Sequence, residues 1–421
     1  MSPLLSRVHP TPTTRRRPHG WLRHYSVLLR PSGVADLPIV FERANERRMR
    51  RLLDSARDAA QQRRHRSRPT MRALIAAPKG NLHWRQVPAP LPPSPLGATV
   101  RPLAIATCDI DCALCHGTTP LLLPLQLGHE CVAEVTAVGA EVATVEVGER
   151  VIVPFQINCG VCEPCKAGFT GSCLGVPPIA AFGMGLLTGH YGGAFADELG
   201  VPYADAMLVP LPDGVDPAAA ASLADNICDA YRHLAPHLPQ VLQRDPDAEV
   251  LIVGSVTRRF SFGSSMPLYS GLIAKALGAR TVTIADNRPA VAEHATRLGL
   301  RVIDPRELRH RAPAPLVVDV SVYPRGLALA LANTAPDGIC TSSGSLNHKG
   351  EVPLLSMYVR NVTLHIGRTH VRSLIPAALD LIVSGKLRPE TVTATVAPLD
   401  EAPSVLRESF RSGGAKVVLT A

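Results

Sequence analysis

The stretch Glu249-Val-Leu-Ile-Val-Gly254, followed by an apolar segment at 268–277 and by Thr281-Val-Thr-Ile-Ala-Asp286, decides the fold class of this chain. Short runs rich in apolar residues are typical of buried parallel strands, and the longer segment between them is typical of a helix. The alternation continues with helices at 290–298 and 327–333 and strands at 316–320 and 339–343. The pattern predicts a doubly wound parallel sheet over residues 226–356, which is a nucleotide-binding architecture.

The residues on either side of this sheet have a different texture. From 71 to 225, short strands such as 131–138 and 149–154 are separated by Gly and Pro, which is typical of an all-β lobe. From 357 to 421 the sequence returns to mixed strands and a helix near 375–383. We therefore predict an α/β protein in which 357–421 complete the β-rich lobe.

The first 70 residues differ from the rest in charge. They hold 16 Arg, no Lys and five acidic residues, a net charge of +11, so the remaining 351 residues net −2 within the total of +9. Three interpretations fit such a composition: a transit segment, a nucleic-acid-binding arm, or a disordered extension with one short helix at 41–62. We adopt the third interpretation, because Met71-Arg-Ala-Leu-Ile-Ala76 opens the first clean strand, and we expect a chain starting at Met71 to keep its fold and activity.

Hydropathy and cysteine usage bound the setting. No window reaches the ~18 uninterrupted apolar residues of a membrane span. The ten cysteines include tight Cys-x2-Cys spacings in a long chain without a secretory signal, which favours thiolates in a reducing cytoplasm over disulfides. Nucleic acid is not an expected partner, because the body of the chain is not basic and aromatic residues make up only 4% of it.

Cys159, Cys162, Cys165 and Cys173 form the most specific motif in the chain. Their spacing, Cys-x2-Cys-x2-Cys-x7-Cys, places four potential thiolates within fifteen residues, in a loop that Gly and Pro can bend. Zn²⁺ takes four such ligands in a tetrahedron, and a closed site of four sulfurs leaves no position for a substrate. The motif therefore predicts a structural zinc.

Three other fragments carry metal-binding residue types. They are Cys108-Asp-Ile-Asp111, Gly128-His-Glu130 and, just before the parallel sheet, Asp225. Alone, each is weak, since a single Cys or His is more often packed in a core than bound to a metal.

With the four-cysteine lobe, these fragments stand in an order that resembles the zinc-dependent medium-chain alcohol dehydrogenases over residues 71–421. Members of that family also keep a C-terminal strand like Lys416-Val-Val418 and a crossing like 357–368. The resemblance implies a GroES-like catalytic domain over 71–225, completed by 357–421, and a Rossmann domain over 226–356.

The resemblance also implies a second, catalytic zinc held by Cys108, His129 and Asp225, with Glu130 as a nearby or exchangeable ligand. A carboxylate in place of a second thiolate leaves the total charge of the three protein ligands at −2. A zinc ion with an open position can lower the pKa of a bound alcohol. Asp111 is expected to hold the ring of His129, although a turn residue is the alternative.

One departure concerns the proton relay, because the family's Ser or Thr two positions after the catalytic cysteine is Ile110 here. Asp229, Cys112 and His116 are candidates for another proton route. Cys112 and Cys115 are expected to be buried apolar residues rather than ligands.

The dinucleotide motif is degenerate. Gly254 ends the first strand, Gly263 lies in an enlarged loop, and Pro267 replaces the third glycine. We expect the pyrophosphate of a dinucleotide near these positions. Arg258 and Arg259 are either phosphate contacts or solvated loop residues. Asp286 stands where a carboxylate binds the adenosine ribose, which favours NAD over NADP, although Arg288 could accommodate a 2′-phosphate. By resemblance, Lys416 approaches the pyrophosphate.

These features predict an NAD-dependent zinc alcohol dehydrogenase that acts on a small alcohol, aldehyde or ketone and forms a homo-oligomer, a dimer or tetramer. The alternative is a catalytically weak relative that keeps zinc for stability and binds a nucleotide poorly, which Ile110 and Pro267 motivate. The sequence does not identify the alcohol.

Overall fold

The computed structural model describes residues 68–117, 119, 121–257, 263–344 and 350–421. The predicted helix at 41–62 and the pair Arg258 and Arg259 therefore lie outside the described residues. None of the helices in the described ranges has the length and hydropathy to cross a bilayer.

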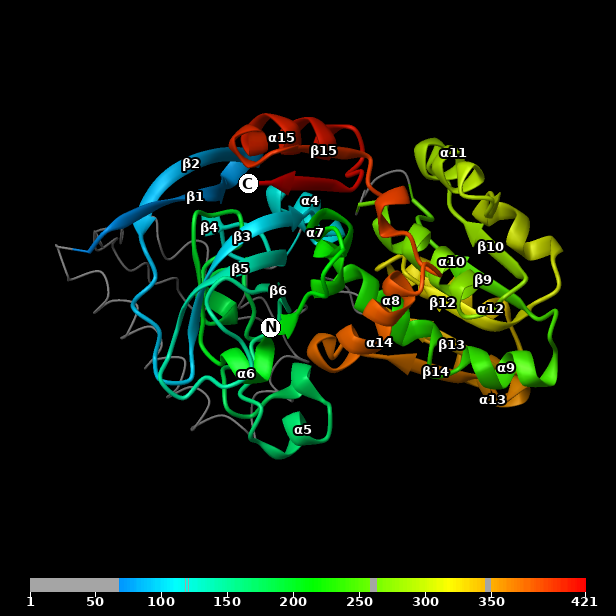
Figure 1. Ribbon diagram of the computed structural model, residues 1–421. Coiled ribbons are helices and arrows are strands. Elements are labelled where there is room, and N and C mark those ends of the chain that lie inside the picture. The colour runs from blue at the N-terminus through cyan, green and yellow to red at the C-terminus, as the bar shows by residue number, and fades with distance from the viewer. Residues whose placement is uncertain (1–67, 118, 120, 258–262, 345–349) are drawn as a thin grey trace, which may run out of the picture. The chain divides into compact units, whose positions relative to one another are not determined.

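The predicted parallel sheet is present, with six strands (Figure 1). In spatial order they are β11 (Arg301–Ile303), β10 (Thr281–Ala285), β9 (Glu249–Val253), β12 (Ala314–Asp319), β13 (Thr334–Ser342) and β14 (Thr363–Ile366). All neighbours pair in parallel. The chain order reverses between β9 and β12, so the carboxyl ends of these two strands mark the crevice where a doubly wound sheet binds its ligand.

Strand β14 corrects the predicted end of this domain. It belongs to the parallel sheet although it lies beyond residue 356. Its sequence, Thr-Leu-His-Ile, lacks the apolar run of a buried strand because it is an edge strand with largely exposed side chains.

Helices cover both faces of the sheet. Val250 and Ile252 of β9 belong to a core cluster with apolar residues of α8, α10 and α14, whereas Leu251 and Val253 belong to a cluster with α12. Successive residues of a strand point to opposite faces, so both faces need apolar residues. The helices of this part are α8 (Asn226–Leu234), α9 (Leu238–Arg244), α10 (Ser265–Ala276), α11 (Pro289–Arg297), α12 (Pro324–Ala332), α13 (Leu354–Arg360) and α14 (Val371–Val383).

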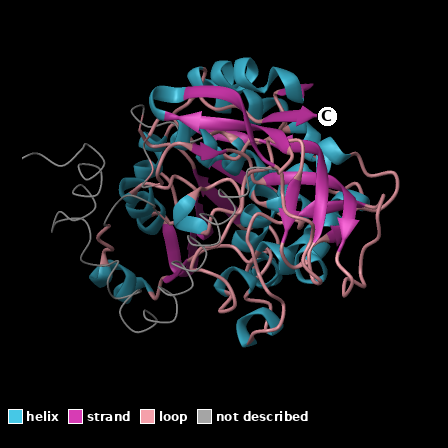
Figure 2. Cartoon of the chain, turned by 90° about the vertical axis from the view of Figure 1, so that its left-hand side faces the viewer, coloured by secondary structure: helices cyan, strands magenta, loops and turns pink. Residues whose placement is uncertain are grey.

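The β-rich lobe joins segments from both ends of the described chain, which are blue and red in Figure 1. The strands of the protein are magenta in Figure 2. Its larger sheet contains β15 (Thr395–Pro398), β16 (Val417–Thr420), β3 (Ala98–Ala106), β5 (Glu130–Val138), β6 (Arg150–Val153) and β8 (Val209–Pro210), with β7 (Leu199–Val201) paired to β3. A smaller sheet contains β2 (Asn81–Pro88), β1 (Thr70–Ala77) and β4 (Leu125–Gln126). Antiparallel pairing of β16 with β3 brings the C-terminal strand beside the segment that leads to Cys108.

Short helices complete the lobe and place the candidate ligands at its strand ends. They are α4 (Asp109–Cys115), α5 (Glu163–Lys166), α6 (Ala204–Met207), α7 (Pro217–Ala220) and α15 (Ala402–Arg411), with the 3-10 turns η2 (Thr170–Ser172) and η4 (Ala221–Ala224).

Candidate functional site

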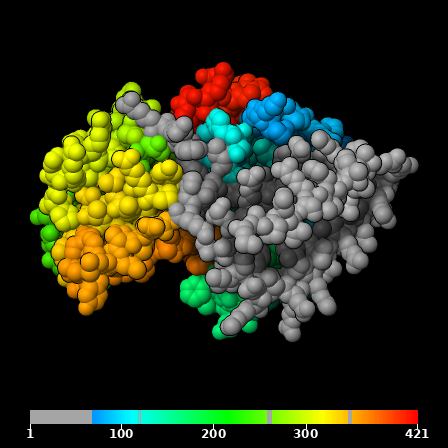
Figure 3. Space-filling view, turned by 180° about the vertical axis from the view of Figure 1, so that it is seen from behind, coloured from blue at the N-terminus to red at the C-terminus, as the bar shows by residue number. Residues whose placement is uncertain are grey.

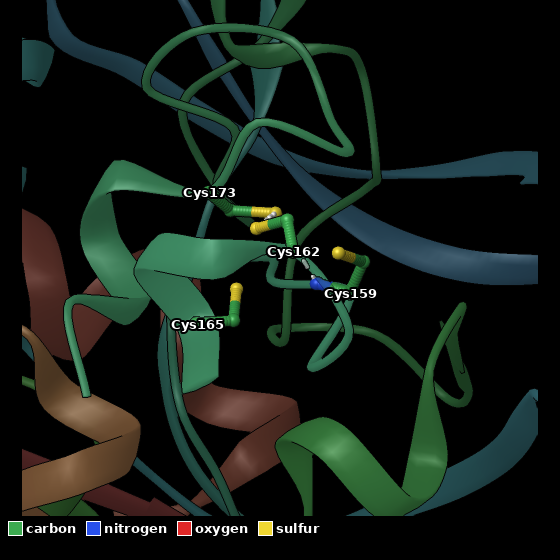
Figure 4. A group of neighbouring side chains, drawn as sticks. All are labelled: Cys159, Cys162, Cys165 and Cys173. Carbon is green, nitrogen blue, oxygen red and sulfur yellow. Dashed lines mark hydrogen bonds between the residues drawn. The ribbon is translucent and has the colours of Figure 1, made fainter. Parts of the chain in front are cut away.

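The four cysteines of the loop between β6 and β7 converge on one point (Figure 4). Their sulfurs all lie within 4.8 Å of one another, and the Sγ atoms of Cys162 and Cys173 are 3.9 Å apart. A tetrahedral zinc with Zn–S distances of ~2.3 Å requires sulfurs about 3.8 Å apart. The four side chains therefore fit a closed zinc site.

Backbone N–H groups donate hydrogen bonds to two of these sulfurs. The amide of Gly175 donates to Sγ of Cys173 at 3.2 Å, and the amide of Leu174 donates to Sγ of Cys162 at 3.4 Å. Burial raises the pKa of the Cys165 and Cys173 thiols. For Cys162, the backbone donors together with hydrogen bonds to Cys165 and Cys159 outweigh burial and lower the pKa to about 6. A Cβ on Gly175 would lie 2.6 Å from Sγ of Cys159, so only glycine fits against this cluster.

A second cluster brings together Cys108, His129 and Asp225, whose ligand atoms also lie within 4.8 Å of one another. Cys108 precedes α4, His129 precedes β5, and Asp225 lies between η4 and α8. The Sγ of Cys108 is 3.0 Å from Oδ2 of Asp225, and Nε2 of His129 is 3.5 Å from the same oxygen. Each residue is more than nine-tenths buried.

The state of His129 tests whether this cluster fits a metal. Within the described part of the chain, neither of its buried ring nitrogens has a hydrogen-bond partner. Burial alone would lower its pKa, but the carboxylates of Asp111 and Asp225 raise the pKa to about 9. A divalent cation bound at Nε2 would take the place of a proton on that nitrogen and satisfy its missing partner. The donor set therefore fits zinc.

Asp111 lies where the sequence predicts a partner for the imidazole. Its Oδ1 is 3.6 Å from Nδ1 of His129, and its Oδ2 accepts a hydrogen bond from the amide of Cys108 at 2.9 Å. The carboxylate of Asp111 therefore binds the backbone amide of one candidate ligand, Cys108, and faces the ring of another, His129.

Lys416 corrects one prediction. Its Nζ is fully buried, 2.6 Å from Oε2 of Glu130, and also donates to the carbonyl of Thr107 and to Oδ1 of Asn226. It therefore pairs with Glu130 rather than approaching a pyrophosphate, because the pairing of β16 with β3 places it beside the segment that leads to the candidate ligand Cys108. Burial raises the pKa of Glu130 to about 7, even though Lys416 lowers it.

The predicted ribose-binding group, Asp286, follows β10 at the carboxyl edge of the parallel sheet. Its oxygens pair with Nε and Nη2 of Arg288 at 3.0 and 2.7 Å, and Oδ2 accepts from the amide of Ser255. A Cβ on Gly254 would lie 2.3 Å from that same Oδ2. Gly254, Asp286 and Arg288 therefore do lie together, with the carboxylate already engaged.

The other predicted pyrophosphate residues lie at the start of α10. Gly263 precedes the helix, and Pro267 is buried in its first turn. Proline is tolerated there because the first N–H groups of a helix have no partner within it.

The candidate proton carriers have other partners. Oδ1 of Asp229 accepts a hydrogen bond from Nε of Arg232 at 2.5 Å. Burial raises the pKa of Asp229, but Arg232 and His233 lower it well below the usual range. Asp229 is therefore held as a carboxylate. Cys112 and Cys115 belong to the apolar core, as expected, and Nδ1 of His116 contacts the carbonyl of Cys112 at 2.8 Å.

Comparison with known proteins identifies the family. Residues 94–213 match the alcohol dehydrogenase GroES-like domain. The chain is 30% identical over 349 residues to a "probable zinc-binding alcohol dehydrogenase" of Mycobacterium tuberculosis, covering 79% of this chain and 83% of that protein. The chain belongs to the zinc-dependent medium-chain alcohol dehydrogenase family.

Two further comparisons agree with this assignment to the medium-chain alcohol dehydrogenases. The structure of alcohol dehydrogenase TADH from Thermus sp. ATN1 is 31% identical, with a TM-score of 0.74, and the match covers 83% of this chain and 99% of that one. L-galactonate-5-dehydrogenase of Escherichia coli is 32% identical over 238 residues, covering 56% of this chain and 62% of that protein.

Asn226 was not among the predicted site residues. Its Nδ2 donates to Sγ of Cys108 at 3.1 Å, and its Oδ1 accepts from Lys416 at 3.0 Å. The residue thus links the sulfur of the candidate ligand to the buried ion pair. Its position next to Asp225 was the available signal.

We expect Lys416→Met to destabilise this dehydrogenase by about 3–5 kcal/mol, because it leaves the buried carboxylate of Glu130 without its cation. Thermal or urea unfolding measures the effect. Lys386→Met is the control, since Lys386 is exposed and its loss should change stability by less than about 0.5 kcal/mol. Adding Glu130→Gln to Lys416→Met should recover part of the stability; no recovery would show that the charge pair is not the cause.

Proposed function

We propose that this protein is a zinc-dependent oxidoreductase that transfers a hydride between an alcohol and NAD, giving an aldehyde or ketone. The observation that carries the proposal is the buried set of Cys108, His129 and Asp225, whose donor atoms converge within 4.8 Å. Three protein ligands leave the fourth position of a tetrahedral zinc for a substrate oxygen.

Zinc in this set would supply Lewis acidity that lowers the pKa of a bound alcohol toward neutrality. The chain's own residues prepare the site for it. Asp111 faces Nδ1 of His129 and so favours the tautomer that leaves Nε2 for the metal. Lys416 balances the charge of Glu130 and keeps it beside the cluster.

Proton exit must follow a different route from the one usual in the family. Ile110 is a partly buried member of the apolar core and has no hydroxyl to relay a proton. Asp229 is committed to Arg232. Neither residue therefore offers a side-chain relay for the alcohol proton.

We propose that the four-cysteine site holds a second, structural zinc. Its four sulfurs complete a tetrahedron without a substrate position.

All ten cysteines are free of disulfides, which supports a reducing compartment, the cytoplasm.

A homo-oligomer is supported by an apolar surface near the edge of the parallel sheet. Leu354, Leu355, Tyr358 and Val359 of α13 are each at least 70% exposed, and β14 carries the exposed Ile366. This stretch belongs to the orange surface in Figure 3. Exposed apolar side chains grouped on one element are typical of contact surfaces.

A hydride acceptor is required by this reaction class, and the parallel sheet would bind a nicotinamide dinucleotide. Asp286 at the end of β10 supports NAD, because a carboxylate there repels a 2′-phosphate.

We expect Asp286→Asn to raise the ratio of kcat/KM for NADP to that for NAD by at least about tenfold, since the charge is removed and Arg288 is released toward a phosphate. Asp304→Asn is the matched control, because Asp304 makes the same kind of pair with Arg306, two residues later, on the surface. A wild-type protein that prefers NADP would overturn the assignment.

The function is tested by incubating the zinc-loaded protein with NAD or NADP and a panel of primary alcohols, secondary alcohols and polyols, and following absorbance of the reduced cofactor. Turnover of at least one alcohol that stops when a chelator removes zinc supports the proposal. No turnover of any alcohol, in a protein shown to hold zinc, would contradict it.

A further inference from the structure

Asp109 occupies the N-terminus of α10 from outside that helix. Its Oδ1 accepts a hydrogen bond from the amide of Ser265 at 3.1 Å, and its Oδ2 accepts one from the amide of Met266 at 3.1 Å. The side chain of Ser264, the residue at the usual capping position, makes no capping hydrogen bond. The carboxylate that caps α10 thus comes from α4, next to the candidate ligand Cys108.

These two amides belong to the helix that follows β9, the strand at the reversal of chain order. In a doubly wound sheet, the N–H groups at this helix end are the ones that bind the pyrophosphate of a dinucleotide. A carboxylate and a phosphate need the same donors. As they stand, the groups at this helix end do not fit a bound pyrophosphate.

The surroundings are shaped to this carboxylate. Asp109 is more than nine-tenths buried, and a Cβ on Gly263 would lie 2.4 Å from its Oδ1. The amide of Gly263 donates to the carbonyl of Asp109 at 3.3 Å. The carbonyl of Gly263 in turn accepts from Nη1 of Arg288 at 2.9 Å. Asp109 is therefore packed in place on both its side chain and its backbone.

We propose that Asp109 is an internal anion that occupies the pyrophosphate position, so that it sets the affinity and specificity of this protein for its dinucleotide. The proposal rests on the proposed function for the identity of the cofactor. The dinucleotide binds only when the carboxylate gives up the amides of Ser265 and Met266. An added phosphate beside the remaining carboxylate would also meet like-charge repulsion in a buried setting.

A simple helix cap is the competing account, and the two make different predictions. A cap stabilises the helix through its acceptor oxygens and its negative charge, whereas an internal anion also opposes phosphate binding through its charge and position. Asp109→Asn keeps a side-chain oxygen for the helix amides but removes the charge. Asp109→Ala removes both, and Asp216→Asn is the control, because Asp216 caps α7 through the amide of Ala218 on an exposed surface.

The test is calorimetric titration of wild type and these three variants with NADH and, separately, with inorganic pyrophosphate. Zinc content is measured for each protein, since Asp109 adjoins Cys108. We expect both Asp109 variants to bind NADH at least about tenfold more tightly than wild type, as expected when a competing charged acceptor is removed. Pyrophosphate should bind Asp109→Ala and Asp109→Asn measurably more tightly than wild type, and Asp216→Asn should match wild type.

Unchanged or weaker binding of both ligands by the Asp109 variants, at full zinc content, would overturn the proposal. Tighter pyrophosphate binding without NADH binding by any variant would uphold Asp109 as an internal anion and contradict the nicotinamide cofactor of the proposed function. The near-isosteric Asp109→Asn keeps the test valid if Asp109→Ala does not fold.

Discussion

Asp225→Ala is expected to lower kcat/KM for alcohol oxidation by at least about 10³-fold, because it removes one of three protein ligands from the open metal site. Zinc content should fall from two ions per chain to one, since the four-cysteine site has separate ligands. Binding of NADH should survive, because the parallel sheet has its own core. Metal analysis, titration with NADH and steady-state kinetics measure the three quantities.

Asp216→Ala provides the control for that substitution, because Asp216 is an exposed carboxylate that precedes a helix of the same lobe. It should keep two zinc ions and full turnover. An Asp225→Ala protein with two zinc ions and wild-type activity would show that the third ligand lies elsewhere, with Glu130 and Cys228 as the next residues to test.

The second large effect is expected for Cys162→Ala, which should lower the melting temperature by about 10 °C or more and remove one zinc ion per chain. Metal binding by a closed four-sulfur site is part of the folding free energy, so losing one ligand loses that contribution. The open site keeps its own ligands, so residual activity should fall with the fraction of folded protein. Calorimetric melting with zinc analysis measures both effects.

Cys340→Ala is the matched control, since Cys340 is fully buried in the parallel sheet and lies outside both clusters. It should keep two zinc ions and lose about 1 kcal/mol of stability. Equal loss of stability in Cys162→Ala and Cys340→Ala, with zinc retained in both, would mean that the cysteine loop holds no structural metal.

The candidate ligands could be predicted from the sequence because local spacing constrains them. The four cysteines lie within fifteen residues, so any fold of that loop keeps their sulfurs near one another. Cys108, His129 and Asp225 were assigned by resemblance, and the structure brings their donor atoms together. Their roles as zinc ligands stay predictions.

The contacts that were missed span long distances in the chain. Lys416 pairs with Glu130 across 286 residues, and Asp109 contacts the amide of Ser265 across 156 residues. Neither pair has a local signal, because each depends on how β16 and α10 pack against the segments that follow β3. The edge strand β14 was also missed, since its exposed side chains hide the pattern of a buried strand.

In the function proposed for this protein, Cys108, His129 and Asp225 hold a catalytic zinc with an open position. Diffraction data collected at the zinc absorption edge from crystals of the zinc-loaded protein test it most directly. We expect two anomalous peaks per chain, one inside the four sulfurs and one bonded to Sγ of Cys108, Nε2 of His129 and a carboxylate oxygen of Asp225. A single peak in the cysteine loop, with no metal at His129, would contradict it.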